Sequence, residues 1–242
     1  MPERSGSESS TLCPWCAWPF EHSRRVKHPL RVTCAPTFAA RWLVPRLAGY
    51  HALPGADAFV LDATQTLLPP GAFEVAIRSG VGPWRGYEST RLLTEQGTPM
   101  LSPGLATRAR RFTVRRLLQI PLIPDPRWPA WFALAGIRDP RPRFVSTRFP
   151  NYELEAQAAM QGLGAALLSP LLFAELVSQG ALIAPFPWIV PGPSSYWLLT
   201  TSDASGAHFV RWIKSQFSVE PALRGSGAAE AQERQVLSAS RS

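Results

Sequence analysis

The chain has 242 residues, of which 45% are hydrophobic and 17% charged, a balance typical of a globular protein with a buried core. No apolar run approaches the roughly 20 residues of a membrane-spanning helix, so we expect no membrane domain. The formal net charge is +8. Its densest basic cluster, between Arg108 and Arg116, fits a solvated helix face better than a nucleic-acid patch.

The first residues, MPERSGSESSTLCPWCAWPF, lack the basic start and apolar core of a secretory signal, so we expect a cytoplasmic protein. Residues 1–29 show neither helical nor strand periodicity, which predicts a disordered leader. Cys13 and Cys16 have C-x-x-C spacing, but no second cysteine pair and no preceding strand accompany them. We therefore predict no metal site. The polar, Gly- and Ala-rich residues 219–242 predict a flexible tail.

The first ordered segment is predicted at residues 30–47. Residues 30–34 alternate as a strand does, and residues 38–47 place their apolar side chains on one helical face. Thr37 stands where a helix N-cap belongs, so its hydroxyl and the following amides of Phe38, Ala39 and Ala40 would form an anion site. A capped strand-to-helix connection without a ligand is the alternative.

The chain then alternates short strands with helices up to residue 217. Strands are predicted at 58–61, 73–77, 99–101, 121–123, 144–145, 165–168 and 196–200, and helices at 152–161, 173–178 and 207–217. This alternation predicts an α/β architecture with mainly parallel sheets. In such sheets a ligand binds beyond the carboxyl ends of the strands.

Six short motifs, in this order and spacing, carry a family resemblance. They are PTFAARWLVPRL at 36–47, VAIRSGVGPWRG at 75–86, LSP at 101–103, WPAW at 128–131, AAMQGLGAAL at 158–167 and SYWLL at 195–199. Together they resemble the effector-binding domain of LysR-type transcriptional regulators, especially the branch that contains the glycine-cleavage activator and AmpR.

The resemblance implies two α/β lobes joined by two crossover strands, as in type 2 periplasmic binding proteins, with a small ligand between the lobes. It places this domain at 30–218, with lobe one at 30–96 plus 195–218 and lobe two at 97–194. It also implies a homodimer formed through the effector domains. The winged helix-turn-helix and linker helix of complete members have no counterpart here, so we expect DNA binding only through a domain absent from this chain.

Seven residues are the predicted ligand site: Thr37, Phe38, Thr64, Arg78, Asn151, Tyr152 and Tyr196. The resemblance implies effector contacts for Thr37 and for Tyr196 of the SYW motif. Asn151 and Tyr152 open the lobe-two helix at which family members commonly place a Ser. Two amide-rich helix starts across a gap would suit a carboxylate, so we expect a small anionic metabolite.

Three of these assignments have structural alternatives. Thr64 follows a predicted strand, where its hydroxyl could instead stabilise a turn. Arg78 could neutralise an anionic ligand through a bidentate contact, or could pair with Glu74. Tyr196 could be a core residue whose hydroxyl finds a protein partner.

The sequence offers little support for an enzyme. The four histidines are scattered, no serine lies in a G-x-S-x-G motif, and Glu153 and Glu155 are spaced to point to different sides of a helix. We therefore predict an effector-sensing domain without catalytic residues or cofactor. The alternatives are a solute-binding protein of a transport system with the same fold and a non-functional truncated remnant.

Overall fold

The computed structural model describes residues 29–69, 71–106, 112–201 and 206–218. The predicted tail and all but the last residue of the predicted leader lie outside these residues, and so do Cys13 and Cys16. None of the helices within the described residues is long and apolar enough to span a membrane.

One six-stranded sheet runs through the molecule in the order β2-β1-β3-β8-β4-β7. Its strands are β1 (Leu30–Cys34), β2 (Phe59–Ala63), β3 (Val75–Gly80), β4 (Glu88–Met100), β7 (Ala166–Leu168) and β8 (Val190–Thr200). Strand β1 pairs in parallel with β2 and β3, whereas every pairing of β4 and β8 is antiparallel. The sheet is thus mixed, and the prediction of a mainly parallel sheet was wrong because the chain returns through its middle.

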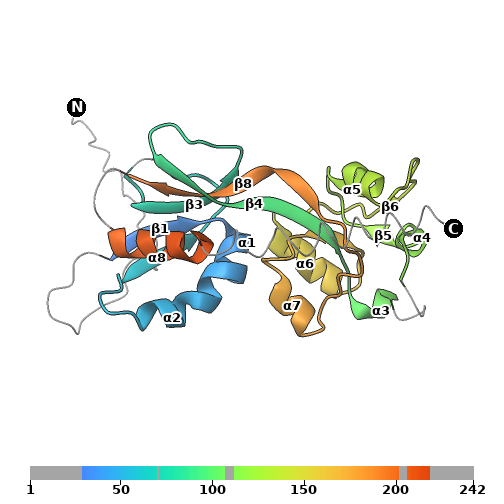
Figure 1. The fold of residues 1–242 in the computed structure, drawn as a ribbon, viewed down its shortest axis with the longest axis horizontal. Helices are drawn as coiled ribbons and strands as arrows, with labels where there is room; N and C mark the ends of the chain where they lie inside the picture. The colour runs from blue at the N-terminus through green and yellow to red at the C-terminus, as the bar shows by residue number, and fades with distance from the viewer. Residues whose placement is uncertain (1–28, 70, 107–111, 202–205, 219–242) are drawn as a thin grey trace, which may run out of the picture.

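Strands β4 and β8 are the two crossovers between the lobes. They run side by side from one lobe into the other (Figure 1), with β8 paired to β3 at one end and β4 paired to β7 at the other. The α/β fold with two lobes and two crossover strands is therefore confirmed. The residue at which each lobe ends stays a prediction.

The local pattern had predicted only the ends of these strands, 99–101 and 196–200. Two irregularities in the β4–β8 register, between Arg91 and Leu93 and between Thr94 and Gln96, break the alternation that marks a strand. Strand β8 also begins with Val190-Pro191-Gly192-Pro193, in which the two prolines and the glycine are poor strand formers.

A helical stretch follows β1 in four short pieces. They are α1 (Pro36–Phe38), a π-helical turn (Ala39–Leu43), a 3-10 turn (Val44–Arg46) and α2 (Leu47–His51). Pro45 has no amide hydrogen to donate and its ring crowds the carbonyl of Arg41, so a regular α-helix cannot pass through this point. Helix α8 (Ala207–Ser218) covers the same face of the sheet (Figure 1).

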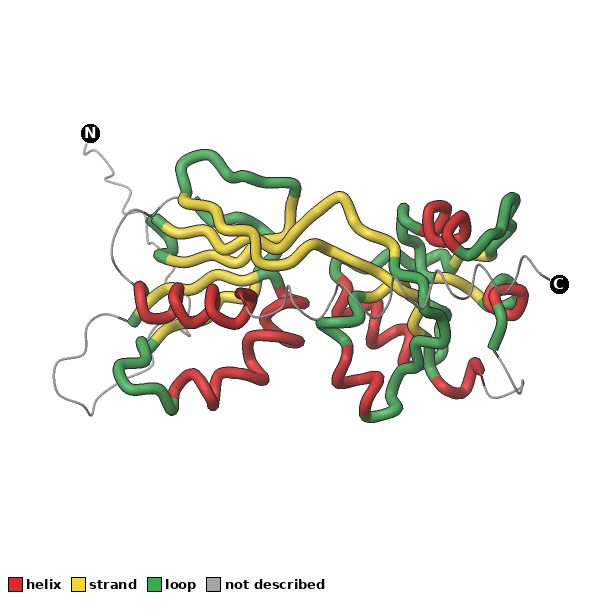
Figure 2. The backbone as a smooth tube through the Cα atoms, in the orientation of Figure 1, coloured by secondary structure: helices red, strands yellow, loops and turns green. Residues whose placement is uncertain are grey.

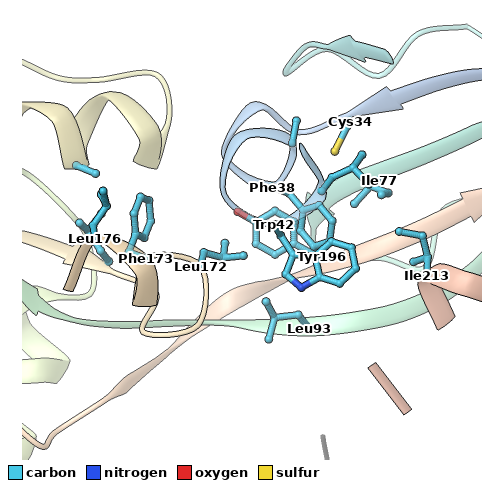
Figure 3. Packing of buried hydrophobic residues seen from close by; sticks show 14 of the residues in the cluster. Cys34, Phe38, Trp42, Ile77, Leu93, Leu172, Phe173, Leu176, Tyr196 and Ile213 are labelled. Carbon is cyan, nitrogen blue, oxygen red and sulfur yellow. The ribbon is translucent and has the colours of Figure 1, made fainter. Parts of the chain in front are cut away.

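Aromatic side chains form the interior between these helices and the sheet. Phe38 packs against Trp42 with ring centroids 5.0 Å apart and against Tyr196 at 5.3 Å. Trp42 stacks on Phe217 of α8 at 4.8 Å. Figure 3 shows Phe38, Trp42 and Tyr196 gathered between the helix after β1 and the crossover strand β8. The first and last elements of the domain are therefore joined in one core.

Lobe two has its own small sheet and five short helices among the described residues. The elements are α3 (Pro103–Ala106), α4 (Val114–Leu117), β5 (Pro121–Leu122), α5 (Trp128–Leu134), β6 (Arg143–Phe144), α6 (Tyr152–Met160) and α7 (Ala174–Ser178). Trp128 and Trp131 are fully buried with Phe132 and Phe186 in a second apolar cluster. Figure 2 shows the long strands linking this lobe to the other.

Candidate functional site

The helix start after β1 differs from the prediction. The N-cap is Ala35, Pro36 is the first helical residue, and Thr37 lies inside the first turn without capping it. Thr37 is buried, and its hydroxyl makes no hydrogen bond to the described residues. The amide of Ala39 already donates to the carbonyl of Ala35 at 2.9 Å. The prediction of a Thr37 cap with three free amides behind it was therefore wrong, because Pro36 shifts the helix start.

Phe38 is a core residue. Its ring is fully buried between Trp42 and Tyr196, so only its backbone is available to a ligand. The predicted ligand contacts of Thr37 and Phe38 stay predictions, and neither residue lines the pocket described below.

Arg78 and Thr64 form a structural pair on β3 and the loop after β2. Arg78 is 2% exposed. Its Nη2 donates to the Thr33 hydroxyl at 2.5 Å and its Nη1 donates to the carbonyl of Thr64. The Thr64 hydroxyl accepts from the amide of Thr66 at 3.2 Å, which is the turn-stabilising role weighed above. The alternative pairing of Arg78 with Glu74 was wrong, since Glu74 instead binds Arg31 at 2.5 Å.

The lobe-two helix α6 begins as predicted. Asn151 is its N-cap, and the side-chain oxygen accepts from the amide of Leu154 at 3.0 Å. Tyr152 follows, and the guanidinium of Arg127 lies over its ring, 5.2 Å from the centroid. The structure thus confirms the cap and places a cation against the neighbouring phenol.

Two polar contacts join the start of α6 to the first lobe. Arg41 lies in the helical stretch after β1 and makes a bidentate ion pair with Glu153. The distance from Nε of Arg41 to Oε2 of Glu153 is 2.5 Å. The Gln65 side-chain amide donates to the carbonyl of Pro150 at 2.5 Å. The two helix starts therefore lie close together across the gap between the lobes, as Figure 1 shows for α1 and α6.

A small pocket lies where the crossovers meet lobe two. The residues that line it come from both crossovers and from three elements of lobe two: Glu95, Gln96, Arg127, Tyr152, Leu167, Ser169, Leu172 and Tyr196. Of the seven predicted site residues, only Tyr152 and Tyr196 are among them. Burial raises the pKa of both phenols above its usual value, so both hydroxyls stay protonated and can donate at neutral pH.

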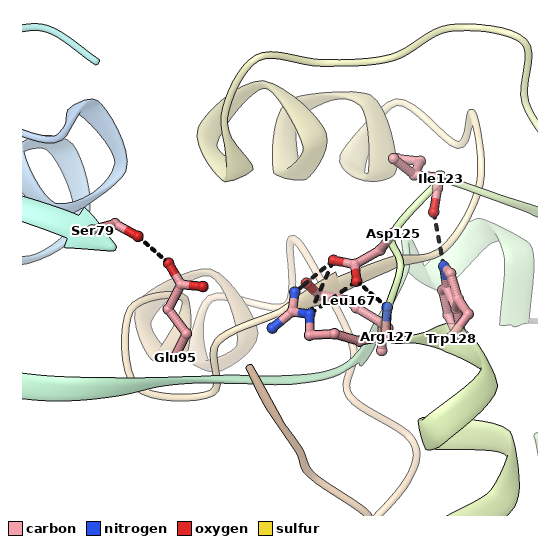
Figure 4. A network of polar contacts seen from close by, with 7 residues as sticks. All are labelled: Ser79, Glu95, Ile123, Asp125, Arg127, Trp128 and Leu167. Carbon is pink, nitrogen blue, oxygen red and sulfur yellow. Dashed lines mark hydrogen bonds and ion pairs between the residues drawn. The ribbon is translucent and has the colours of Figure 1, made fainter. Parts of the chain in front are cut away.

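Two charged side chains line this pocket, and Figure 4 shows the polar contacts that each of them makes. Glu95 is 8% exposed, and its Oε1 accepts from the hydroxyl of Ser79 at the end of β3. Arg127 is 7% exposed and ion-paired with Asp125 at 2.6 Å, while its Nη2 also donates to the Leu167 carbonyl at 3.0 Å. No group of three or more potential metal ligands exists among the described residues.

The family is decided by comparison with known proteins. Residues 23–218 match the model of the LysR substrate binding domain. The chain belongs to this family.

Relatives of the LysR substrate binding domain in this chain are transcriptional activators. The AmpR activator of Rhodobacter capsulatus is 31% identical over 202 residues, which cover 80% of this chain and 68% of that protein. The glycine cleavage system transcriptional activator of Escherichia coli K12 is 27% identical over 209 residues, covering 82% of this chain and 68% of the relative. The AmpR activator of Pseudomonas aeruginosa is 32% identical, and this chain spans 58% of its length.

The fold of this LysR domain matches solved effector domains. The effector domain of AmpR from Pseudomonas aeruginosa superposes with a TM-score of 0.69 at 28% identity, covering 80% of this chain and 97% of that structure. The AmpR effector binding domain from Citrobacter freundii superposes with the same score at 24% identity, covering 79% of this chain and 99% of that structure.

Four polar residues of the pocket in this LysR domain were missed by sequence analysis: Glu95, Gln96, Arg127 and Ser169. Glu95 had a local signal, because the alternation in LLTEQ places it on the same strand face as the buried Leu93. A carboxylate on a buried strand face needs a partner, which marks it as a candidate. Arg127 stands directly before the WPAW motif and carried no signal of its own.

Proposed function

We propose that this chain is the effector-sensing domain of a LysR-type transcriptional regulator and that a small molecule binds in the pocket between the crossovers and lobe two. The observation that carries the proposal is the composition of the pocket wall. Both crossovers and three elements of lobe two contribute to it, so a ligand there touches parts that move when the lobes change their angle.

The contacts between the lobes supply a means of response. The Arg41–Glu153 and Gln65–Pro150 contacts hold the lobes together in this structure. A ligand that binds the closed arrangement more tightly than an open one shifts the population toward closure. In a homodimer formed through these domains, that shift would change the relative placement of the subunits.

The remaining parts of the proposal concern the setting of the domain. Since the relatives are transcriptional activators, we infer a regulatory, non-enzymatic role in the cytoplasm. DNA contact in such a regulator is proposed to come from sequence outside the matched residues 23–218. The purified chain by itself is then expected not to retard a promoter fragment at physiological salt in a gel-shift assay.

A thermal-shift screen tests the sensing role. The purified chain is screened against a broad metabolite library, and a bound effector at 100 times its Kd should add about 2.7 kcal/mol of stability. Tyr152→Phe, which removes a hydroxyl from the pocket wall, should reduce the shift, and Tyr87→Phe outside the pocket should not. A library without any stabilising compound contradicts the proposal.

A further inference from the structure

The carboxylate on the crossover wall of the pocket has no ion-pair partner among the described residues. The Glu95 carboxylate accepts one hydrogen bond, from the Ser79 hydroxyl, and its Oε2 makes none to the described residues. No described arginine, lysine or histidine lies within ion-pair distance of Glu95. The guanidinium of Arg127 attracts this carboxylate from beyond ion-pair distance. The carboxylate is nine-tenths buried and has a single neutral hydrogen-bond donor, so its Oε2 favours a ligand that brings a cation or a strong donor.

Lobe two contributes to the pocket a donor, Arg127, whose charge is already balanced. The Asp125 carboxylate accepts hydrogen bonds from Nε and Nη2 of Arg127 in a bidentate ion pair. Nη1 makes no hydrogen bond to the described residues. The pair with Asp125 leaves a net charge close to zero on this wall, but the free Nη1 still offers hydrogen-bond donors suited to a carboxylate.

Two glycines, one in each crossover, make room for these groups. A Cβ atom on Gly97 of β4 would lie 3.1 Å from Nη1 of Arg127. A Cβ atom on Gly192 of β8 would lie 2.9 Å from the Cβ of Glu95 and 3.3 Å from its Oε2. A side chain at position 192 would displace Glu95, whereas one at position 97 would require the end of the Arg127 side chain to move by a few tenths of an ångström.

The rest of the wall limits the polarity of a ligand. Leu167 and Leu172 supply an apolar surface, while the phenols of Tyr152 and Tyr196 supply neutral donors. A simple anion would be repelled by the Glu95 carboxylate, and a simple amine would leave Nη1 of Arg127 without an acceptor.

We propose that the effector is a small zwitterion of the α-amino-acid class, with its ammonium group on Glu95 and its carboxylate on Nη1 of Arg127. Glu95 is then the residue that selects the amino group. This inference rests on the sensing role proposed above, and it refines the expected anionic metabolite into one that also carries a positive charge.

Matched sets of compounds test the ligand class on the purified 242-residue chain. One set is alanine, lactate and ethylamine, and a second is leucine, 2-hydroxyisocaproate and isopentylamine, with both enantiomers where they exist. Calorimetry and thermal shift should detect binding of an amino acid at least about tenfold tighter than that of its hydroxy acid or amine. Equal binding of the hydroxy acid, or binding of neither amino acid, overturns the proposal.

Variants of Glu95 test its role separately. Glu95→Gln keeps the shape and an acceptor for Ser79, and it should weaken amino-acid binding about tenfold or more and abolish the preference over the hydroxy acid. Glu95→Asp keeps the charge and should keep the preference even if affinity falls. Glu88→Gln, at the exposed start of the same strand, should change neither. An unchanged preference in Glu95→Gln, with the apo protein folded by circular dichroism, overturns the assignment.

Failure of the amino-acid proposal can be told apart from failure of the proposed sensing role. If the broad library yields a stabilising compound that is not a zwitterion, the sensing role stands and the assignment of Glu95 falls. If neither the library nor the matched sets yield any binder, both fall.

Discussion

The two large apolar clusters of the molecule differ in how far they reach. The cluster around Phe38 and Trp42 continues from lobe one into lobe two through Leu172 and Phe173, whereas the cluster around Trp128 and Trp131 lies within lobe two. The contacts between lobes include polar pairs such as Arg41 with Glu153 and Gln65 with Pro150. Apolar burial makes the cluster inside lobe two rigid, whereas the polar pairs between the lobes, worth about 1 kcal/mol each, can be overcome by ligand binding.

The largest expected effect is a loss of stability when a side chain of the lobe-two interior is removed. Trp131 is fully buried and its Nε1 donates to the carbonyl of Trp188 at 3.0 Å. Trp131→Ala should lower the free energy of unfolding by about 3–5 kcal/mol, measured by urea denaturation. Trp131→Phe keeps most of the packing and should cost clearly less. A loss below about 1 kcal/mol for the alanine variant would show that the cluster is not closely packed.

The second effect concerns a buried carboxyl group behind the pocket. Glu155 in α6 is 7% exposed and its Oε2 has no partner among the described residues. Burial, and then the charge of Asp125, raise the pKa of Glu155 to about 8, against a lowering by Arg127. The folded state therefore holds a proton that the unfolded state loses near pH 4.3, and this stabilisation is lost as the pH rises through about 8.

Glu155→Gln removes this titration. The stability of the variant relative to the wild type should rise by about 4 kcal/mol between about pH 5 and pH 9, in urea denaturation at both values, since about three pH units at about 1.36 kcal/mol each separate pH 5 from the raised pKa. Glu175→Gln, at an exposed position of α7, should show the pH dependence of the wild type. Parallel pH profiles of wild type and Glu155→Gln would contradict the raised pKa of this carboxyl.

The third effect concerns the ion pair between the lobes. A double-mutant cycle with Arg41→Ala and Glu153→Ala should give a coupling energy of about 1 kcal/mol, since both side chains are mostly buried and the contact has two prongs. The exposed Arg141–Asp139 pair, at 3.3 Å, is the control and should give no measurable coupling. Equal coupling in the two cycles would show that the bridge does not hold the lobes together.

The smallest effect concerns Thr37. Thr37→Val should reduce the ligand-dependent stabilisation by less than about 1 kcal/mol, since the hydroxyl lies outside the pocket wall and can contribute only one hydrogen bond. The measurement is a thermal shift with the compound that the library identifies. The exposed Thr66→Val is the control, and a complete loss of binding in Thr37→Val would place the site at the start of α1 instead.

Much of the fold could be predicted from sequence because its signals are local. The strand β1, the helix α6 with its Asn151 cap and the buried face of α8 follow from periodicity and capping chemistry. The order of the motifs then indicated the family and, with it, the two crossovers. Most of β4 and β8 could not be predicted from local patterns. Register shifts in β4 and prolines in β8 interrupt the alternation of apolar and polar residues that marks a strand.

The site was decided by tertiary structure. The sequence by itself determined that Tyr152 and Tyr196 belong to a helix start and a strand near the lobe junction, and both line the pocket. Glu95, Arg127 and the two glycines beside them come from elements far apart along the chain. Only the antiparallel pairing of the crossovers and the docking of α5 bring the charged groups of Glu95 and Arg127 to one pocket. No local sequence pattern encodes contacts between segments so far apart along the chain.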